Sequence, residues 1–192
     1  MPNRWIPFLA NHYYHVYNRG VNGALIFFCD ENYRYLLRLL RKNLDRHDVA
    51  IVAYCLLPNH YHFLLMPSQD DNLHLMMKGL FGSYSQAVNK QQNRQGPLFQ
   101  GRFRSILVDK DEYLVHLARY IHLNPVSAGI VRAPQYWTYS NYPDLIGQRA
   151  GKLTDSSLVP ARFPDGVSYR QFVEDGLKVS RKLLDIEKYL LE

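Results

Sequence analysis

Two apolar runs separated by a short turn constrain the fold of this chain most strongly. Residues 49–57 form a continuous apolar run of strand length, and residues 60–66 alternate between the two faces of a second strand. The Pro-Asn pair at residues 58–59 lies between them and favours a tight turn. In the second run His60 and His62 share one face, because side chains on a strand alternate. The pattern predicts an antiparallel hairpin, with a bulge within the strand pair as an alternative.

The remaining elements follow from residue spacing and from turn residues. Strands are predicted over residues 12–18 and 105–108. A helix capped by Asp30 has leucines at helical spacing, and a second helix runs from about Asn72 to Gln92. A third helix begins at Asp109, has Glu112 three residues later as in a capping box, and ends before Pro125.

This order of elements defines the expected fold class. Strand, helix, two strands, helix, strand and helix predict an α+β fold with a ferredoxin-like antiparallel sheet and helices packed on one face. We expect one domain over residues 1–148 and a small helical C-terminal extension over residues 149–192. Residues 167–191 have the helical pattern within that extension, with mixed charges.

The charge distribution favours a polyanionic partner. Residues 1–149 hold 16 Lys and Arg against 10 Asp and Glu, which accounts for the whole net charge of +6. The two cysteines form no Cys-x-x-Cys pair, which argues against a zinc or redox site. No apolar run approaches the roughly 18 residues that span a bilayer. We therefore expect a cytoplasmic, nucleoid-associated protein with no membrane partner.

The tripeptide His60-Tyr61-His62 is a candidate metal site. Two imidazoles at positions i and i+2 of a strand lie on one face and can converge on one metal ion. They leave open positions for oxygen ligands and water. The alternative is a strand with two hydrogen-bonded histidines near the surface.

The end of the third predicted helix supplies two more candidates. Tyr120 and Asn124 are one turn apart and share a face. Asn124 would give an oxygen ligand beside the histidines, and Tyr120 would direct its hydroxyl at a bound phosphate. A tyrosine hydroxyl is a poor nucleophile at neutral pH, so a divalent metal that polarises the phosphate would help it. The alternative is an ordinary amphipathic tyrosine.

Three separated segments, together with the run at 128–131, resemble one family. They are Leu57-Pro-Asn-His-Tyr-His62, Leu98-Phe-Gln-Gly-Arg-Phe-Arg104 and Tyr120-Ile-His-Leu-Asn-Pro125, the last followed by Ala128-Gly-Ile-Val131. In this order they resemble the single-tyrosine HUH transposases, and more closely the REP-associated tyrosine transposases. The resemblance covers about residues 8–145.

The resemblance implies a fold, a metal and a reaction. Mg²⁺ or Mn²⁺ would be bound by His60 and His62, with Asn124 at the family's position for a third polar ligand. Tyr120 would attack single-stranded DNA and leave a 5′-phosphotyrosine and a free 3′-hydroxyl. The substrates would be DNA hairpins with a flanking guide sequence. One branch of the family works as homodimers and the REP-associated branch resembles monomers, so both states stay open.

Basic and aromatic residues interleave before the third helix. Arg94, Arg102 and Arg104 flank Phe99 and Phe103, a combination that suits single strands because phosphates pair with arginine and bases stack on rings. The alternative for the two rings is a structural role in the core.

Three functions from different classes fit these features. The leading one is a transposase that cleaves and rejoins DNA. The second is a non-catalytic DNA-binding regulator derived from a transposase, which would need neither the metal nor Tyr120. The third is a metal-dependent phosphodiesterase that uses water as the nucleophile and forms no protein-linked DNA. A rolling-circle or plasmid-mobilisation nickase ranks below these, because such proteins are usually larger.

Overall fold

The computed structural model describes residues 7–151, 153 and 161–178. A single antiparallel sheet lies at its centre, with the strand order β2-β3-β1-β4. Its strands are β1 (Tyr13–Arg19), β2 (Val49–Leu57), β3 (His60–Pro67) and β4 (Arg104–Val108). The predicted hairpin of β2 and β3 is confirmed, since Leu57 pairs with His60 across the two-residue turn.

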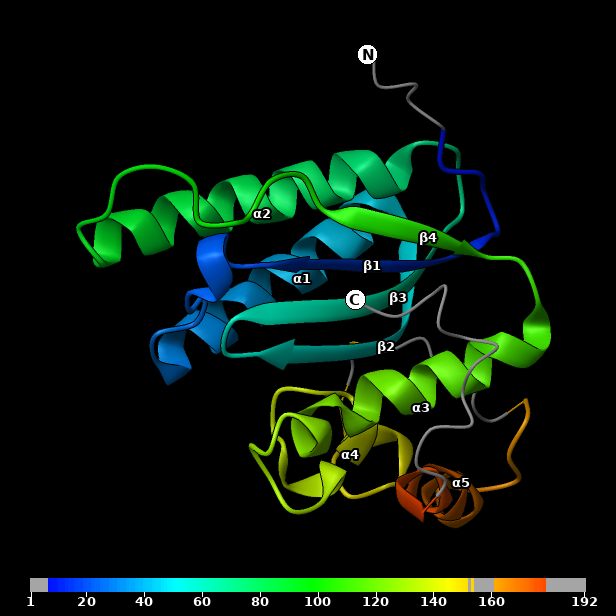
Figure 1. Ribbon diagram of the computed structural model, residues 1–192. Coiled ribbons are helices and arrows are strands. Elements are labelled where there is room, and N and C mark those ends of the chain that lie inside the picture. Colours follow the sequence, from blue (N-terminus) through cyan, green and yellow to red (C-terminus); the bar gives the residue numbers. More distant parts are fainter. Residues whose placement is uncertain (1–6, 152, 154–160, 179–192) are drawn as a thin grey trace.

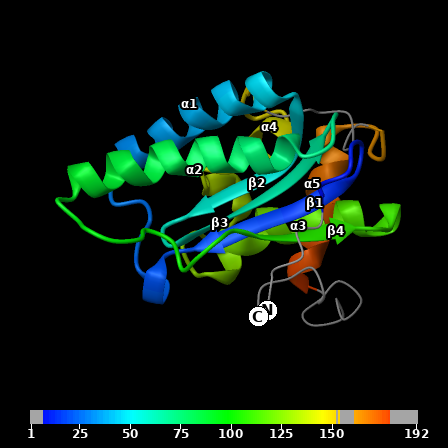
Figure 2. The same cartoon turned by 90° about the horizontal axis from the view of Figure 1, so that it is seen from above.

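Helices cover both faces of this sheet. They are α1 (Asp30–His47), α2 (Asn72–Gln91), α3 (Asp111–Ser127), α4 (Tyr142–Leu145) and α5 (Gly166–Lys178), with 3-10 turns at Val21–Gly23 and Pro134–Tyr136. The predicted α+β class and antiparallel sheet are confirmed. Helices α1 and α2 share one face as expected, but α3 lies on the opposite face, where the expected plan had placed no helix (Figures 1 and 2).

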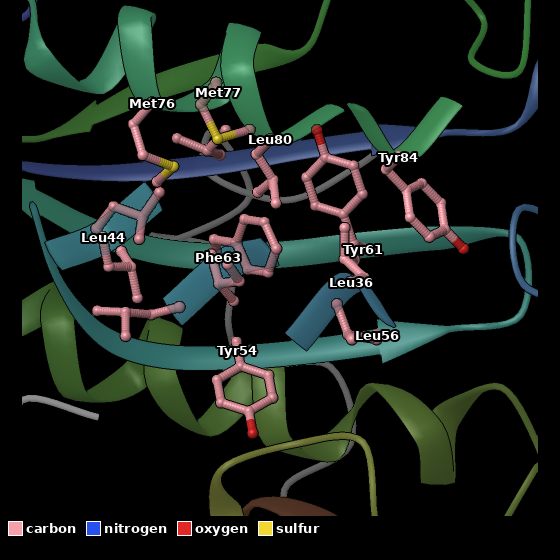
Figure 3. Packing of buried hydrophobic residues seen from close by; sticks show 14 of the residues in the cluster. Leu36, Leu44, Tyr54, Leu56, Tyr61, Phe63, Met76, Met77, Leu80 and Tyr84 are labelled. Carbon is pink, nitrogen blue, oxygen red and sulfur yellow. The ribbon is translucent and has the colours of Figure 1, made fainter. Parts of the chain in front are cut away.

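The pleat of β3 serves both faces. Tyr61, Phe63 and Leu65 are fully buried in the core beneath α1 and α2. Figure 3 shows Tyr61 and Phe63 among side chains from both helices. Leu64 instead belongs to a second core with Leu117 and neighbouring side chains of α3. The alternation predicted from the sequence therefore separates two cores, one on each side of the sheet.

A bulge in β2 adjusts which side chains face each core. The β2–β3 register shifts between Ile51 and Ala53, so Val52 has no partner in it. Val52 and Ala53 both pack in the core beneath α3, whereas Ile51 and Tyr54 face the other core. The carbonyl of Val52 accepts a hydrogen bond from the side chain of Asn141 at 2.8 Å.

The segment at residues 137–141 covers the outer edge of β2. Leu56 N donates to Tyr139 O at 2.9 Å, and Trp137 Nε1 donates to Leu56 O at 2.9 Å. Cys55 forms an isolated bridge with Ser140. Backbone groups of the edge strand are thereby paired, which an exposed edge would leave open. The aromatic stretch after α3 thus folds back onto the domain.

Three predicted helix boundaries are wrong. Helix α1 is capped by Cys29, and Asp30 lies inside its first turn. Helix α3 starts at Asp111 rather than Asp109, because Lys110 still has the extended backbone of the connection from β4; no capping box forms. Pro125 lies inside α3, which continues to Ser127. The proline removes one backbone donor, the N–H that would bond to Ile121 O, and the helix ends within the next turn.

The predicted C-terminal extension contributes α5 to the described part of the chain. Tyr169 and Val173 of α5 pack with Leu123 of α3 and with Tyr142. The rest of the predicted helical segment, residues 179–191, lies outside the described residues. Within the described residues no helix has both the length and the apolar character needed to cross a bilayer.

Candidate active site on the α3 face of the sheet

The structure brings three of the predicted site residues to one place. His60 and His62 lie on the α3 face of β3, and their rings are 5.2 Å apart between centroids. The ring of Tyr120, from α3, stands edge-on to His62 with centroids 5.6 Å apart. This meeting depends on α3 lying on the face opposite to α1 and α2.

His62 is fully buried and has one ring nitrogen without a hydrogen-bond partner. Its Nδ1 lies 2.9 Å from Nε2 of His15 on the neighbouring strand β1, whereas its Nε2 is buried and unpartnered. Burial lowers the pKa of His62 well below its usual value, and the neighbouring His15 and His60 add to this. The ring is therefore neutral at physiological pH, the form that binds metals.

His60 presents the same nitrogen. Its Nδ1 lies 2.6 Å from Oδ1 of Asn59, which can only accept, so Nδ1 carries the proton in the neutral ring and Nε2 is left for other contacts. The side-chain amide of Asn59 is oriented by a second bond to Gly23 O at 3.3 Å. Burial lowers the pKa of His60; a hydrogen bond with Asn124 opposes the shift and Arg19 adds to it.

Asn124 is thus the fourth predicted residue at this place. Its Nδ2 donates to the backbone oxygen of Tyr120 at 3.3 Å, which holds the Asn124 side chain against the helical turn that carries Tyr120. Both residues are half-buried. The interaction of Asn124 with His60 sets this helix end against the start of β3.

These donors fit a divalent metal ion. A buried imidazole nitrogen with no partner is costly, and a metal ion would satisfy it. Among the described residues no group of three or more His, Cys, Asp and Glu side chains is arranged to hold a metal. The candidate set is therefore His60, His62 and the amide oxygen of Asn124, a mixture of nitrogen and oxygen ligands.

The predicted DNA contacts separate onto different surfaces. Arg104 pairs in register with Tyr17 of β1. Arg104 is two residues before Ile106 and four before Val108, so all three side chains are on the same face of β4. Ile106 and Val108 face α3, so Arg104 lies on the side of the candidate active site. Arg94 lies elsewhere, half-buried, with its guanidinium 5.8 Å from the ring centre of Phe28.

Phe99, Phe103 and Arg102 line a cavity on the opposite face. This cavity of about 710 Å³ lies along α2 and beside β4. Phe99 packs against Phe81 with centroids 5.0 Å apart and also contacts the core ring of Tyr61. Phe103 is half-buried against Phe8, and Arg102 is exposed. The structural alternative therefore holds for Phe99 at least in part, while Arg102 remains free to contact a ligand.

Sequence reasoning missed His15 and Tyr17. Both lie on the strand β1 that pairs with β3, and the ring of Tyr17 is 6.1 Å from that of His62. The only signal in the sequence was that His15 and Tyr17 are two residues apart in a predicted strand and so share one face. That signal does not say which strand is the neighbour or which residues stand opposite, so the contact with His62 could not be found from spacing.

The fold is an antiparallel sheet that carries a histidine pair beneath the helix of Tyr120. The model of the family described as "Transposase IS200 like" matches residues 9–124. The chain belongs to this family, and the resemblance predicted from its motifs is confirmed.

Known proteins that are similar to this chain include a curated relative and a solved structure. A Haemophilus influenzae protein named as a REP-associated tyrosine transposase is 29% identical over 112 residues, or 53% of this chain. The matched part is 64% of that protein, so the chain spans less than two thirds of its length. The solved structure of a REP-associated tyrosine transposase bound to a REP hairpin matches with a TM-score of 0.64 and 20% identity. It covers 81% of this chain and 94% of the other, and it shows the fold alone.

The position of Phe99 leads to a stability prediction. Replacing Phe99 with alanine removes a ring packed against Phe81 and Tyr61, so we expect the free energy of unfolding to fall by about 2 kcal/mol. The exposed Arg102→Ala variant should stay within about 0.5 kcal/mol of the unmodified chain. Urea denaturation measures both. Equal stability of the two variants would mean that Phe99 is not part of the core.

Proposed function

We propose that this chain is a metal-dependent transposase that cleaves and rejoins single-stranded hairpin DNA, with Tyr120 as the nucleophile. The observation that carries the proposal is the position of Tyr120 beside His62, with ring centroids 5.6 Å apart, on the face that also holds His60 and Asn124. A regulator that only binds DNA would have no need for this arrangement.

His60, His62 and Asn124 are the proposed metal ligands. The ion would be Mg²⁺ or Mn²⁺, which accept nitrogen and oxygen ligands and keep open positions. When bound, it supplies a positive charge that polarises the scissile phosphate and stabilises charge on the oxygens. Nε2 of His15 would accept a hydrogen bond from the protonated Nδ1 of His62. This bond would leave Nε2 of His62 directed at the metal site.

Tyr120 would carry out the covalent step. Its hydroxyl oxygen attacks the phosphorus of a DNA phosphodiester while the bond between phosphorus and the 3′-oxygen breaks, and overall the hydroxyl proton passes to the released 3′-oxygen. The products are a 5′-phosphotyrosine on Tyr120 and a free 3′-hydroxyl, so the phosphoester is kept for rejoining to another 3′-hydroxyl. Tyr120 lies on α3, which packs on the sheet, so its hydroxyl is already positioned for the reaction when the phosphate binds.

All proposed active-site residues belong to one protomer. Tyr120 lies on a helix that packs on its own sheet through Leu117 and Ile121. No helix from a second copy is needed to complete this set. The arrangement supports action as a monomer, which was one of the two states left open by the sequence.

The proposed partner is a DNA hairpin with an adjoining single strand. The similar solved structure is bound to a REP hairpin, and the excess positive charge of this chain suits the same kind of ligand. Arg104 lies on the face of the active site, and Arg102 and Phe103 lie beside the cavity along α2. We propose that Arg102 and Arg104 contact phosphates on either side of β4, while Arg94 contributes at the loop before it.

Tyr120→Phe tests the nucleophile. This variant removes only the hydroxyl, so we expect loss of the covalent protein–DNA adduct with hairpin affinity within about twofold of the unmodified protein. The assay incubates labelled hairpins from the DNA that flanks the gene with Mn²⁺ or EDTA and looks for a denaturation-resistant band. Cleaved DNA without any adduct would favour hydrolysis by water and overturn the proposal.

His15→Leu tests the metal site without relying on activity. Loss of the acceptor for His62 Nδ1 should weaken Mn²⁺ binding by roughly 10–100-fold. Calorimetric titration of the free protein with Mn²⁺ measures this directly. His12→Leu is the matched control, because His12 is exposed and bonds only locally to Ala10 O. The same affinity in both variants would contradict the proposed role of His15 in orienting His62.

The salt dependence of hairpin binding tests the arginines. Arg102→Ala and Arg104→Ala should each flatten the slope of log affinity against log salt by about one unit, because each phosphate contact releases about one counterion. Arg41→Ala, exposed on α1 far from both surfaces, should leave the slope unchanged. Binding titrations at several salt concentrations give the slopes, and three equal slopes would exclude these contacts.

A further inference from the structure

A buried chain of hydrogen bonds joins α5, the tyrosine helix and strand β2. His122 of α3 is fully buried, with Nδ1 2.8 Å from the hydroxyl of Tyr169 on α5. Its Nε2 lies 2.9 Å from Oδ1 of Asn141. The side chain of Asn141 in turn bonds to the backbone of β2, at Tyr54 N and Val52 O, each at 2.8 Å.

The direction of each bond follows from Asn141. Its Nδ2 donates to Val52 O, so its Oδ1 is the atom that accepts from both Tyr54 N and His122 Nε2. The proton of His122 is therefore on Nε2. The ring is fully buried between a phenol and an amide, neither of which carries a charge, so it is neutral. Nδ1 must then accept, and Tyr169 donates its hydroxyl proton to it.

A second contact holds α5 against α3. Arg119 of α3 is buried, and its guanidinium lies 4.5 Å from the ring centre of Phe172 on α5. The same group donates to Phe172 O at 3.4 Å and bonds His116 Nδ1 at 3.0 Å. Gly176 lets the helices approach, because a Cβ there would stand 2.7 Å from Arg119 Cδ.

We propose that α5 positions the nucleophile helix through Tyr169, His122 and Asn141, so that the C-terminal extension sets the placement of Tyr120 over the histidine pair. The inference rests on the proposed function of Tyr120. His122, Asn141 and Tyr169 are positioning residues, since none of them lies in the candidate active site.

The geometry explains how the placement is transmitted. His122 lies between Tyr120 and Asn124 on one rigid turn of α3, so a shift of His122 shifts both. Asn141 is fixed to β2, and β2 pairs with the strand that carries His60 and His62. The network thus fixes α3 relative to the sheet at the helical turn that carries Tyr120 and Asn124. Figure 1 shows α5 lying against α3 on the side away from the sheet.

Tyr169→Phe is the decisive variant. It keeps the ring in the core and removes the one proton that His122 Nδ1 accepts. Displacing a reacting group by about 1 Å can cost on the order of 100-fold in rate, so we expect single-turnover adduct formation to slow at least about tenfold. Hairpin affinity should stay within about twofold. Gly176→Leu, which pushes α5 away from Arg119, should slow adduct formation in the same way.

Two controls separate positioning from stability. Val167→Ala changes an exposed side chain of α5 and should behave as the unmodified protein. Val88→Ala removes methyl groups from the core beneath α1 and α2, so it should lower the melting temperature without slowing adduct formation at a temperature where it stays folded. Hydrogen exchange of the α3 amides should accelerate in Tyr169→Phe and stay unchanged in Val88→Ala.

The outcomes distinguish this inference from the proposed function. An unchanged rate of adduct formation in Tyr169→Phe overturns the positioning role. An equal loss of rate in Val88→Ala would mean that lower stability alone slows adduct formation, and this also overturns the positioning role. Faster exchange in α3 together with no adduct in the unmodified protein would reject the proposed function while supporting the mechanical link between α5 and α3.

Discussion

Strand β3 carries two sets of side chains with opposite requirements, and the pleat of the sheet keeps them apart. Tyr61 and Phe63 need a dry core, which α1 and α2 provide. His60 and His62 need polar neighbours, which the face beneath α3 provides. A slip of one residue in the register would exchange the two sets and destroy both. The fold and the candidate chemistry therefore depend on the same strand pairing.

Other polar side chains hold the polar groups beneath α3. Asn59 orients His60, His15 contacts His62, and each bond selects which ring nitrogen is left for a ligand. Such arrangements are costly when one member is missing, because a buried donor or acceptor is then unpaired. Because of this cost, the hydrogen bonds constrain the ring orientations of His60 and His62 more tightly than the sheet backbone alone would.

The sequence was sufficient for the elements and for the motif residues, and insufficient for their mutual placement. The hairpin at residues 49–66 and the pairing of Tyr120 with Asn124 follow from local spacing. A helix with an apolar stripe shows which side is buried but not which face of the sheet it covers, so the position of α3 was missed. The contact of His15 with His62 needs the β1–β3 register. The link from His122 to Tyr169 spans 47 residues, and no local pattern encodes it.

The two edges of the sheet are unequal. Residues 137–141 run along the second half of β2 and occupy its backbone groups at Tyr54 and Leu56, so that stretch of the edge is not open to a further strand. In the described part of the chain β4 has a neighbour on one side only, so its edge is open to a strand from another molecule. A strand added there would lie next to Arg104 and Ser105, between the two surfaces proposed to contact DNA. Assembly through the sheet and occupancy by nucleic acid would then compete for the same stretch of backbone.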